Sequence, residues 1–425
     1  MSRTLVIAVL VTLVVGVLIG YGIGGARPAV APGEQQQAYE THTIVALLPL
    51  TGALSTFGEN SKETALLAAA DVNAWLEREG KDWRLELKIE DTATDGPTAL
   101  AKMKAWYGSG VTLFVGPQAS GEAKELLTFA NANKILFISP SSTSPALSIP
   151  DDYLFRFCPD DFIQGPAIAR VLWDAGVRHV IFTWRGDTWG DGLQKAAEES
   201  FKKLGGQVFE KSLRYDPGLE DFPKEAALLN DYVQELIDSG VSKDEIGIVI
   251  IAFEEIAPYM EAASKYPLLE ELLWFGSDGS ALSEALKEHP VGAQFAANTK
   301  LINTFFTPGL SKYPLFDYVR GHVFKVLGRE TDAYSYNTYD QVWALALAID
   351  EVGYDAEKIK EILPRVTDEH TKLYGASGHI VLNENGDRAF ADYDLWVIND
   401  SLEWEKVGVW RGASDSIDWF REIYK

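Results

Sequence analysis

The chain has 425 residues, enough for two domains with buried cores. Its formal net charge of −24 excludes the basic surface typical of nucleic-acid-binding proteins, so no nucleic-acid partner is expected. A single cysteine, Cys158, excludes an internal disulfide and a cysteine-based metal cluster, and no metal or cofactor site is predicted.

The N-terminal segment contains an apolar run over residues 5–23 without a charged residue. A run of about 18 or more apolar residues can span a bilayer. We therefore predict that residues 1–26 form a signal peptide or, slightly favoured, an uncleaved membrane anchor. Residues 27–40 contain prolines and glutamines and are expected to form a flexible tether. The rest of the chain is expected outside the cytoplasm, in the periplasm or at the cell surface.

From residue 43 onward, strand-like and helix-like segments alternate, which is typical of doubly wound parallel sheets. In the first half, strands are predicted over 43–50, 83–90, 111–115 and 135–138. Helices are predicted there over 61–79, 97–106 and 122–133. Parallel strands joined by helical crossovers place their carboxyl ends at one edge of the sheet, so the loops after these strands are expected to lie together.

The second half continues the alternation around its own sheet. Strands are predicted over 179–184, 207–213, 246–252 and 272–275. Helices are predicted over 163–175, 191–204, 222–239 and 256–265. The remainder is expected to contain a strand over 299–306, helices over 313–327, 336–352 and 356–363, and short strands over 378–382, 393–397 and 404–410.

The two halves differ in the residues that follow their strands. The first half offers neutral hydroxyls in the stretches Val115-Gly-Pro-Gln-Ala-Ser120 and Ile138-Ser-Pro-Ser-Ser-Thr143. The second half offers carboxylates and large aromatic rings. If the halves face each other, one wall suits a carboxylate and the other an ammonium, which together match a zwitterionic amino acid. The alternative is that these serines and prolines only make turns.

The order and spacing of several segments resemble the branched-chain amino-acid (Leu/Ile/Val) binding protein family, the type I periplasmic-binding fold of ABC importers. The segments are Pro49-Leu-Thr-Gly-Ala-Leu-Ser-Thr-Phe-Gly58, Ala70-Asp-Val-Asn73, Glu90-Asp-Thr-Ala-Thr-Asp95, the two hydroxyl-rich stretches, Phe155-Arg156, Asp187-Thr-Trp-Gly-Asp-Gly192 and Gly276-Ser-Asp278. The resemblance covers roughly residues 41–410.

The resemblance implies two α/β lobes joined by three crossover strands. Lobe 1 would contain residues 41–158 and 281–388, and lobe 2 residues 159–280 and 389–415. The crossovers would lie near residues 156–161, 278–282 and 386–393, where a hinge would allow the cleft to close on a ligand.

The resemblance also implies how the head of the ligand is held. Ser120 and Thr143, with backbone groups of Gln118 and Ser141, would bind the α-carboxylate. Asp278 would bind the α-ammonium. The competing interpretation is that these residues cap helices or make turns, and for Ser120 both roles can coexist.

Three aromatic residues, Phe57, Trp189 and Phe253, would wall the side chain of the ligand. Trp189 and Phe253 stand where well-known family members have tyrosines, which removes two hydroxyl donors and leaves the identity of the ligand side chain open. The competing interpretation places these rings in the core. Four nearby charged residues, Arg185, Asp187, Glu254 and Glu255, are expected to form a solvated rim.

No sequence motif for catalysis is present. The six histidines form no metal-binding pair of the H-E-x-x-H kind, and there is no P-loop and no G-x-S-x-G elbow. We therefore predict a non-enzymatic, solute-binding protein that delivers an amino acid or similar small polar solute to ABC permease subunits. The alternatives are a sensor or receptor ligand-binding module, or the binding of an amide, urea or another solute. The use of the sequon at Asn399 and the oligomeric state stay open.

Overall fold

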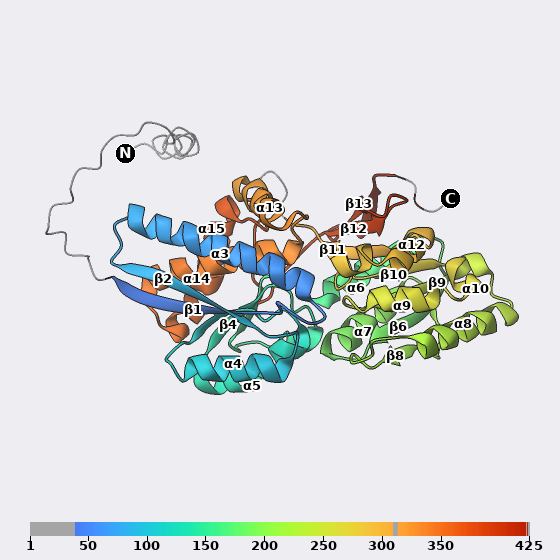
Figure 1. Cartoon of the computed structure of the whole chain (residues 1–425), viewed down its shortest axis with the longest axis horizontal. Helices are drawn as coiled ribbons and strands as arrows, with labels where there is room; N and C mark the ends of the chain where they lie inside the picture. The colour runs from blue at the N-terminus through green and yellow to red at the C-terminus, as the bar shows by residue number, and fades with distance from the viewer. Residues whose placement is uncertain (1–38, 309–312, 422, 424–425) are drawn as a thin grey trace. The chain divides into compact units, whose positions relative to one another are not determined.

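The computed structural model describes residues 39–308, 313–421 and 423 (Figure 1). The predictions for residues 1–26, and for the tether up to residue 38, lie outside the described residues. The chain divides after Tyr39, and Glu40–Lys425 forms one compact unit. Among the described residues, no helix is both long enough and apolar enough to cross a bilayer.

The first sheet has five parallel strands in the spatial order β2-β1-β3-β4-β5. Their bounds are β1 Glu40–Leu48, β2 Trp83–Asp91, β3 Leu113–Val115, β4 Leu136–Ser139 and β5 Leu154–Arg156. Side chains of a strand alternate between the two faces, so Ile44 and Val45 enter different cores.

Five helices cover the faces of this sheet. On the side of Val45 lie α4 (Gly96–Tyr107) and α5 (Ser120–Asn133). On the side of Ile44 lie α3 (Ser55–Arg78), α14 (Ala333–Val352) and α15 (Ala356–Tyr374). Helix α13 (Pro314–Leu327) packs on α3. We refer to this sheet and these helices as lobe 1.

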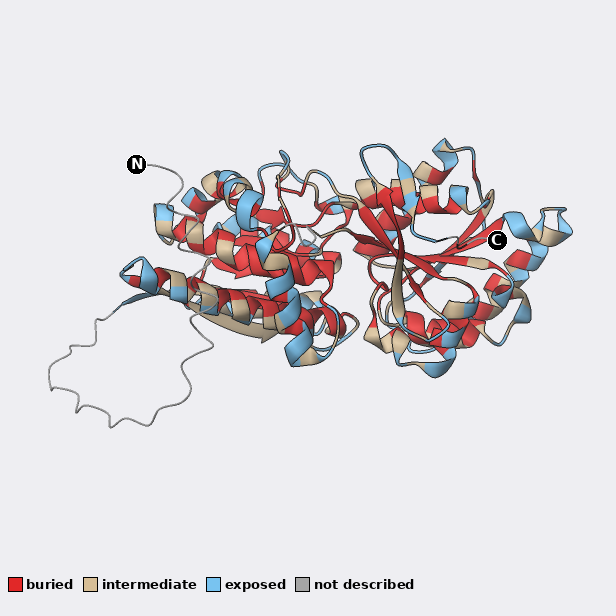
Figure 2. Cartoon of the chain, turned by 90° about the horizontal axis from the view of Figure 1, so that it is seen from above, coloured by how far each residue is buried: buried red, intermediate tan, exposed pale blue. Residues whose placement is uncertain are grey.

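The second sheet runs β14-β13-β12-β11-β10-β9-β6-β7, and β8 also pairs with β6. Its strands are β6 His179–Arg185, β7 Gln207–Val208, β8 Leu213–Tyr215, β9 Ile246–Ile251, β10 Leu273–Gly276, β11 Ile302–Phe306, β12 Tyr393–Ile398, β13 Trp404–Arg411 and β14 Ser416–Trp419. The strands from β6 to β11 pair in parallel, whereas β12, β13 and β14 add an antiparallel edge. Figure 2 shows that the central strands of this sheet are buried.

Helices cover both faces of the second sheet as well. One face carries α6 (Asp161–Asp174) and α7 (Thr188–Lys203). The other face carries α8 (Pro223–Asp238), α9 (Ile256–Ala263) and α12 (Pro290–Asn298), with the short helices α10 (Pro267–Glu270) and α11 (Glu284–Lys287) beside them. We refer to this sheet and these helices as lobe 2. The two doubly wound, mainly parallel sheets confirm the predicted type I periplasmic-binding-like fold class.

The sheet pairing differs from the prediction that the chain returns to lobe 1 at residue 281. Strand β11 pairs with β10 at Phe275–Ile302 and with β12 at Asn303–Trp396, so it belongs to lobe 2. The physical reason is burial, because all five residues of this strand are buried and its apolar rings complete the lobe 2 core. The other predicted lobe boundaries stay predictions.

Two further differences concern the C-terminal part. The strand predicted over 378–382 is reduced to an isolated bridge between Leu382 and Arg388. The edge strand β14 was not predicted, and α15 continues through Pro364 to Tyr374 instead of ending at residue 363.

Candidate ligand-binding site

A small cavity lies where lobe 1 meets lobe 2. Its lining residues are Leu54, Phe57, Gln118, Ala119, Ser120, Ser141, Trp189, Phe253, Asp278, Gly279 and Tyr334. The structure therefore brings together all the predicted site residues except Thr143, which is fully buried outside the lining. The cavity encloses about 20 Å³, which is close to the space that one water molecule needs. The lobes are thus closed against each other at this point.

Four helices begin at the cavity. Their first residues supply much of its lining: Leu54 and Phe57 from α3, Ala119 and Ser120 from α5, Trp189 from α7 and Tyr334 from α14. The first N–H groups of a helix lack partners within the helix and carry a partial positive charge, so they favour an anion. Among these helix starts, that of α5 carries Ser120 on the lobe 1 side of the cavity and suits a carboxylate there.

The hydroxyl wall of lobe 1 is tied together by its own hydrogen bonds. Ser120 Oγ accepts from the Ser144 N–H at 3.1 Å, so its own O–H remains able to donate. Ser141 Oγ donates to the Gln118 carbonyl at 3.0 Å. The amide of Gln118 donates to Ser61 Oγ at 2.6 Å, so this side chain is committed to α3 and holds the loop in place.

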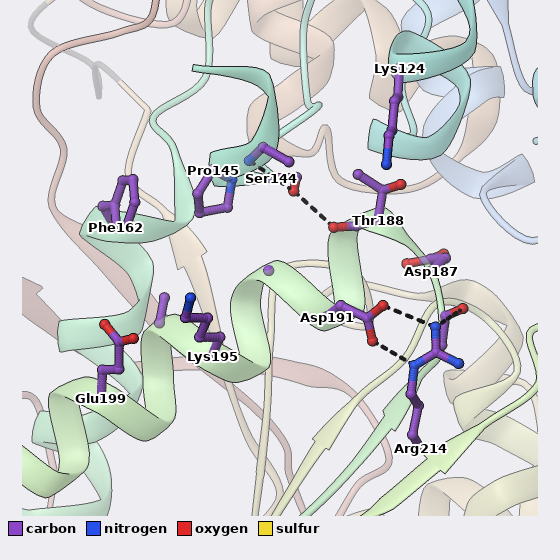
Figure 3. A pocket seen from close by; sticks show the side chains of 14 residues that line it. Lys124, Ser144, Pro145, Phe162, Asp187, Thr188, Asp191, Lys195, Glu199 and Arg214 are labelled. Atoms are coloured by element: carbon purple, nitrogen blue, oxygen red, sulfur yellow. Dashed lines mark hydrogen bonds and ion pairs between the residues drawn. The ribbon is translucent and has the colours of Figure 1, made fainter. Parts of the chain in front are cut away.

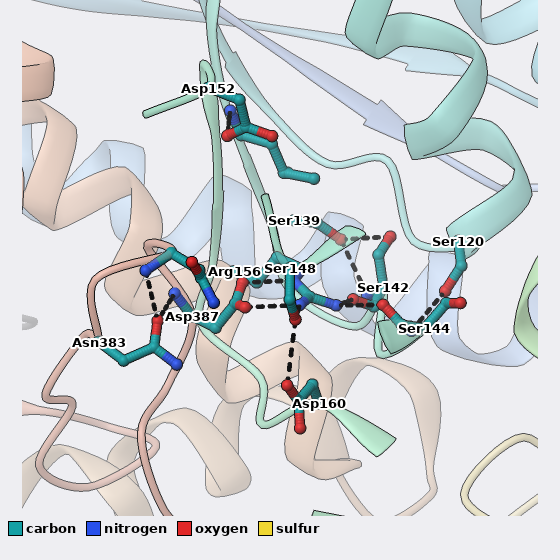
Figure 4. A network of polar contacts seen from close by, with 12 residues as sticks. Ser120, Ser139, Ser142, Ser144, Ser148, Asp152, Arg156, Asp160, Asn383 and Asp387 are labelled. Atoms are coloured by element: carbon teal, nitrogen blue, oxygen red, sulfur yellow. Dashed lines mark hydrogen bonds and ion pairs between the residues drawn. The ribbon is translucent and has the colours of Figure 1, made fainter. Parts of the chain in front are cut away.

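A buried arginine, Arg156, holds the loop that carries these hydroxyls (Figure 4). Arg156 Nη1 donates to the carbonyls of Ser142 and Ser144 at 2.8 and 2.9 Å. Its Nη2 donates to Ser148 Oγ at 2.6 Å and to Asp387 Oδ2 at 2.6 Å. The resulting network fixes the backbone of the loop that carries the hydroxyls.

The lobe 2 wall contains one buried carboxyl group, Asp278, and a second, Asp161, is buried outside the lining. Asp278 Oδ2 accepts from the Tyr334 hydroxyl at 2.5 Å, and this bond joins the lobes. Burial raises the pKa of Asp278 to about 6. Asp161, the first residue of α6, is fully buried, and burial together with the charge of Asp278 raises its pKa well above its usual value. Within the described residues, neither Asp161 oxygen nor Asp278 Oδ1 makes a hydrogen bond of normal geometry.

Aromatic rings form the third part of the lining. The rings of Trp189 and Phe253 stack with centroids 4.5 Å apart and an interplanar angle of 17°. The Arg185 guanidinium lies 4.0 Å from the Phe253 centroid and pairs with Asp187 and Glu255, each at 2.6 Å. Arg185 is therefore a buried support of the aromatic wall, where a solvated rim had been predicted.

Tyr334 of the lining was not predicted, and neither was Asp161, which is fully buried outside the lining. Asp161 follows a capping residue, Asp160, and in the sequence it is typical of an ordinary helix start. Tyr334 lies in the first turn of α14, which begins three residues before the predicted helix. The Asp332 cap at this point was the available signal.

A larger groove of about 690 Å³ lies beside the cavity (Figure 3). Its lining comes from α5, from η1 (Pro145–Leu147) and from α7, and it carries charges of both signs. Ser144 Oγ donates to the Thr188 carbonyl at 2.8 Å across it, and Arg214 pairs with Asp191 at 2.7 Å. Among the described residues, no cluster of histidine, cysteine, aspartate or glutamate could hold a metal ion.

A family profile described as the receptor family ligand binding region matches residues 60–401. The chain belongs to this family. An uncharacterized protein of Methanocaldococcus jannaschii is 31% identical over 389 residues, which covers 88% of this chain and 90% of that protein. A Leu/Ile/Val-binding protein homolog of Brucella melitensis is 22% identical and covers 87% of this chain and 94% of that protein.

Solved structures confirm the fold of this family member. The leucine binding protein LivK of Thermotoga maritima superposes with a TM-score of 0.72 at 24% identity, covering 86% of this chain and 98% of that structure. The Leu/Ile/Val-binding protein homolog and the leucine binding protein are solute-binding proteins, not enzymes, which confirms the non-enzymatic class predicted from the sequence.

Proposed function

We propose that this family member is an extracytoplasmic solute-binding protein of an ABC importer and that it captures an amino acid, or a similar small polar solute, between its lobes. The single observation that carries the proposal is the composition of the interlobe cavity, where serine hydroxyls on lobe 1 face Asp278 on lobe 2. The likeness to Leu/Ile/Val-binding proteins supports it. Residues 1–26 would hold the protein at the membrane, near its permease partners.

The two walls would divide the charges of the ligand. The α-carboxylate would accept from Ser120 and from the free N–H groups at the start of α5, with Thr143, Ser141 and Gln118 as further backbone or hydroxyl support. The α-ammonium would lie beside the carboxylate of Asp278, the lobe 2 carboxyl group that lines the cavity. The carboxylate and the ammonium of a zwitterion would thereby each form charge-assisted hydrogen bonds with a protein group that loses its water when the cleft closes.

The aromatic part of the lining would contact the ligand side chain. Phe57, Trp189 and Phe253 offer ring surface, and the cavity holds about 20 Å³ in the closed structure. A ligand larger than a water molecule would therefore require the lobes to open before it enters the cleft. Because no hydroxyl of Trp189 or Phe253 is available, the ligand side chain would be recognised mainly by apolar contact.

Calorimetry against the twenty amino acids, and against amides and urea, tests the proposal. The best ligand is then measured again with Asp278→Asn and with Asp400→Asn, a control that removes an exposed aspartate. We expect Asp278→Asn to weaken binding at least tenfold and the control to leave it unchanged. If no amino acid binds, or if Asp278→Asn retains full affinity, the amino-acid assignment is wrong. Preferred binding of an amide or urea would replace it.

A further inference from the structure

Helix α3 receives its N-terminal cap from the opposite lobe. Glu254 Oε1 accepts from the Thr56 N–H at 2.9 Å, and Glu254 Oε2 accepts from Ser55 Oγ at 3.0 Å. The Glu254 N–H donates in turn to the Ala53 carbonyl at 3.2 Å. We call these three hydrogen bonds the Glu254 latch. All of them join lobe 2 to the start of α3 in lobe 1.

The other three helices that begin at the cavity are capped by carboxylates close to them in sequence. Glu122 accepts from the Ala119 N–H at the start of α5 at 2.9 Å. Asp187 accepts from the Gly190 N–H of α7 at 2.8 Å, and Asp332 accepts from the Ser335 N–H of α14 at 2.9 Å. These three caps do not depend on how the lobes are placed.

Helix α3 has no such local group. Its N-cap position is Leu54, which offers no side-chain acceptor, and its first turn contains no acidic residue. When the lobes separate, the free N–H groups of this 24-residue helix lose their carboxylate. The cap is present in this structure, where the lobes are in contact, and separation of the lobes would remove it.

Lobe 2 holds Glu254 in position through the residue that follows it. Glu255 Oε1 accepts from Arg185 Nη1 at 2.6 Å and from the Tyr215 hydroxyl at 3.0 Å. It also accepts from the Phe253 N–H at 3.2 Å. Glu255 thus ties the turn to the lobe 2 interior and leaves the neighbouring Glu254 directed towards lobe 1.

We propose that Glu254 is a positioning residue that stabilises the closed form of the cleft by capping α3 across the lobes, so that it slows ligand release without touching the ligand. Its effect on affinity rests on the proposed binding function, whereas its effect on closure requires no ligand. The aromatic wall contains Phe253, so the latch forms next to the residues that enclose the cavity.

Binding kinetics of the best amino-acid ligand test the latch. Loss of a helix cap typically lowers an equilibrium constant about 2- to 30-fold, so we expect Glu254→Ala to raise the dissociation rate and Kd by that factor with a nearly unchanged association rate. Glu254→Gln keeps one acceptor oxygen and should fall between. Glu361→Ala removes an exposed glutamate of α15 and should change neither rate. An unchanged dissociation rate in Glu254→Ala overturns the proposal.

A second measurement is independent of any ligand. Dyes attached through Ser109→Cys in lobe 1 and Lys224→Cys in lobe 2 report the closed-to-open ratio by single-molecule energy transfer, and the buried Cys158 stays unlabelled. We expect Glu254→Ala to lower this ratio about 2- to 30-fold. An unchanged ratio overturns the latch, even if no amino acid binds. Failure of the binding screen with a lowered ratio would instead count against the proposed ligand and support the latch.

Discussion

Removal of the Asp387 carboxylate tests the ion pair beneath the hydroxyl wall. Arg156 Nε and Nη2 donate to Asp387 at 2.5 and 2.6 Å, and the Arg156 side chain is 0% exposed. In Asp387→Ala the cation keeps its bonds to two carbonyls and to Ser148 but loses its counter-charge. Breaking a buried pair on one side costs about 3–5 kcal/mol. Because domains are stable by about 5–15 kcal/mol, this is a large share of the total.

Urea unfolding of Asp387→Ala, Arg156→Met and the double variant measures the effect. We expect the double variant to lose at least about 2 kcal/mol less than the sum of the single variants, because it leaves no unpaired charge in the interior. Asp151→Asn is the control, since Asp151 pairs with Lys360 at the surface, is 94% exposed and has a φ of 62° that asparagine tolerates; its unfolding midpoint should hardly move. A cost below about 1 kcal/mol for Asp387→Ala, or additive single variants, would show that the pair does not stabilise this loop.

Three further predictions concern the site and its supports. Asp278 must be ionised to hold an ammonium, and burial raises its pKa to about 6. Calorimetry from pH 8 to pH 5 should therefore show that the Kd of the ligand rises as the pH falls below about 6. A constant Kd would contradict this prediction. Burial raises the pKa of Glu122 from 4.5 to about 7, so the folded protein loses stability as the pH rises from about 4.5 to about 7. Glu122→Gln has no proton to lose, so we expect it to be more stable than the unsubstituted protein at pH 8 by on the order of 3 kcal/mol, and equally stable near pH 4.5. Equal urea midpoints of the two proteins at pH 8 would refute this prediction. A Cβ on Gly279 would lie 2.4 Å from Trp189 Cη2 and 2.7 Å from the Ala252 carbonyl oxygen. Gly279→Ala should therefore destabilise the folded protein by about 1–3 kcal/mol in thermal unfolding and weaken ligand binding. The control is Gly121→Ala, whose Cβ meets no atom within 4 Å, and it should be neutral or stabilising in the same measurement.

The alternation of strands and helices was predictable because it depends on local patterns. The buried strand β9 and the amphipathic helix α8 were placed within a residue of their observed bounds. The helices that begin at the cleft start several residues earlier in the chain than the sequence predicts. Helix α3 begins six residues before the predicted start, since its cap, Glu254, lies 198 residues away from Thr56 in the sequence. When the capping residue comes from another lobe, the sequence around the helix start contains no capping residue that would mark the start.

The candidate site was predictable where its residues follow strands and incomplete where its residues lie at the starts of helices. Ser120, Ser141 and Asp278 follow strands of the predicted sheets, so the topology places them. Asp161 and Tyr334 depend on how α6 and α14 dock, which no local pattern encodes. The assignment of β11 to lobe 1 failed for the same reason, because the choice of sheet is made by tertiary packing.

The position of α14 and α15 on the first sheet has a consequence for biosynthesis. Ile44 of β1 shares its core with Leu345, Ile359 and Leu363, which are made about 300 residues later. At roughly 5–20 residues per second, that interval lasts about 15–60 s on the ribosome. During this time α3 is the helix already made for this face of the earliest strand, and the part of the core that α14 and α15 complete stays open.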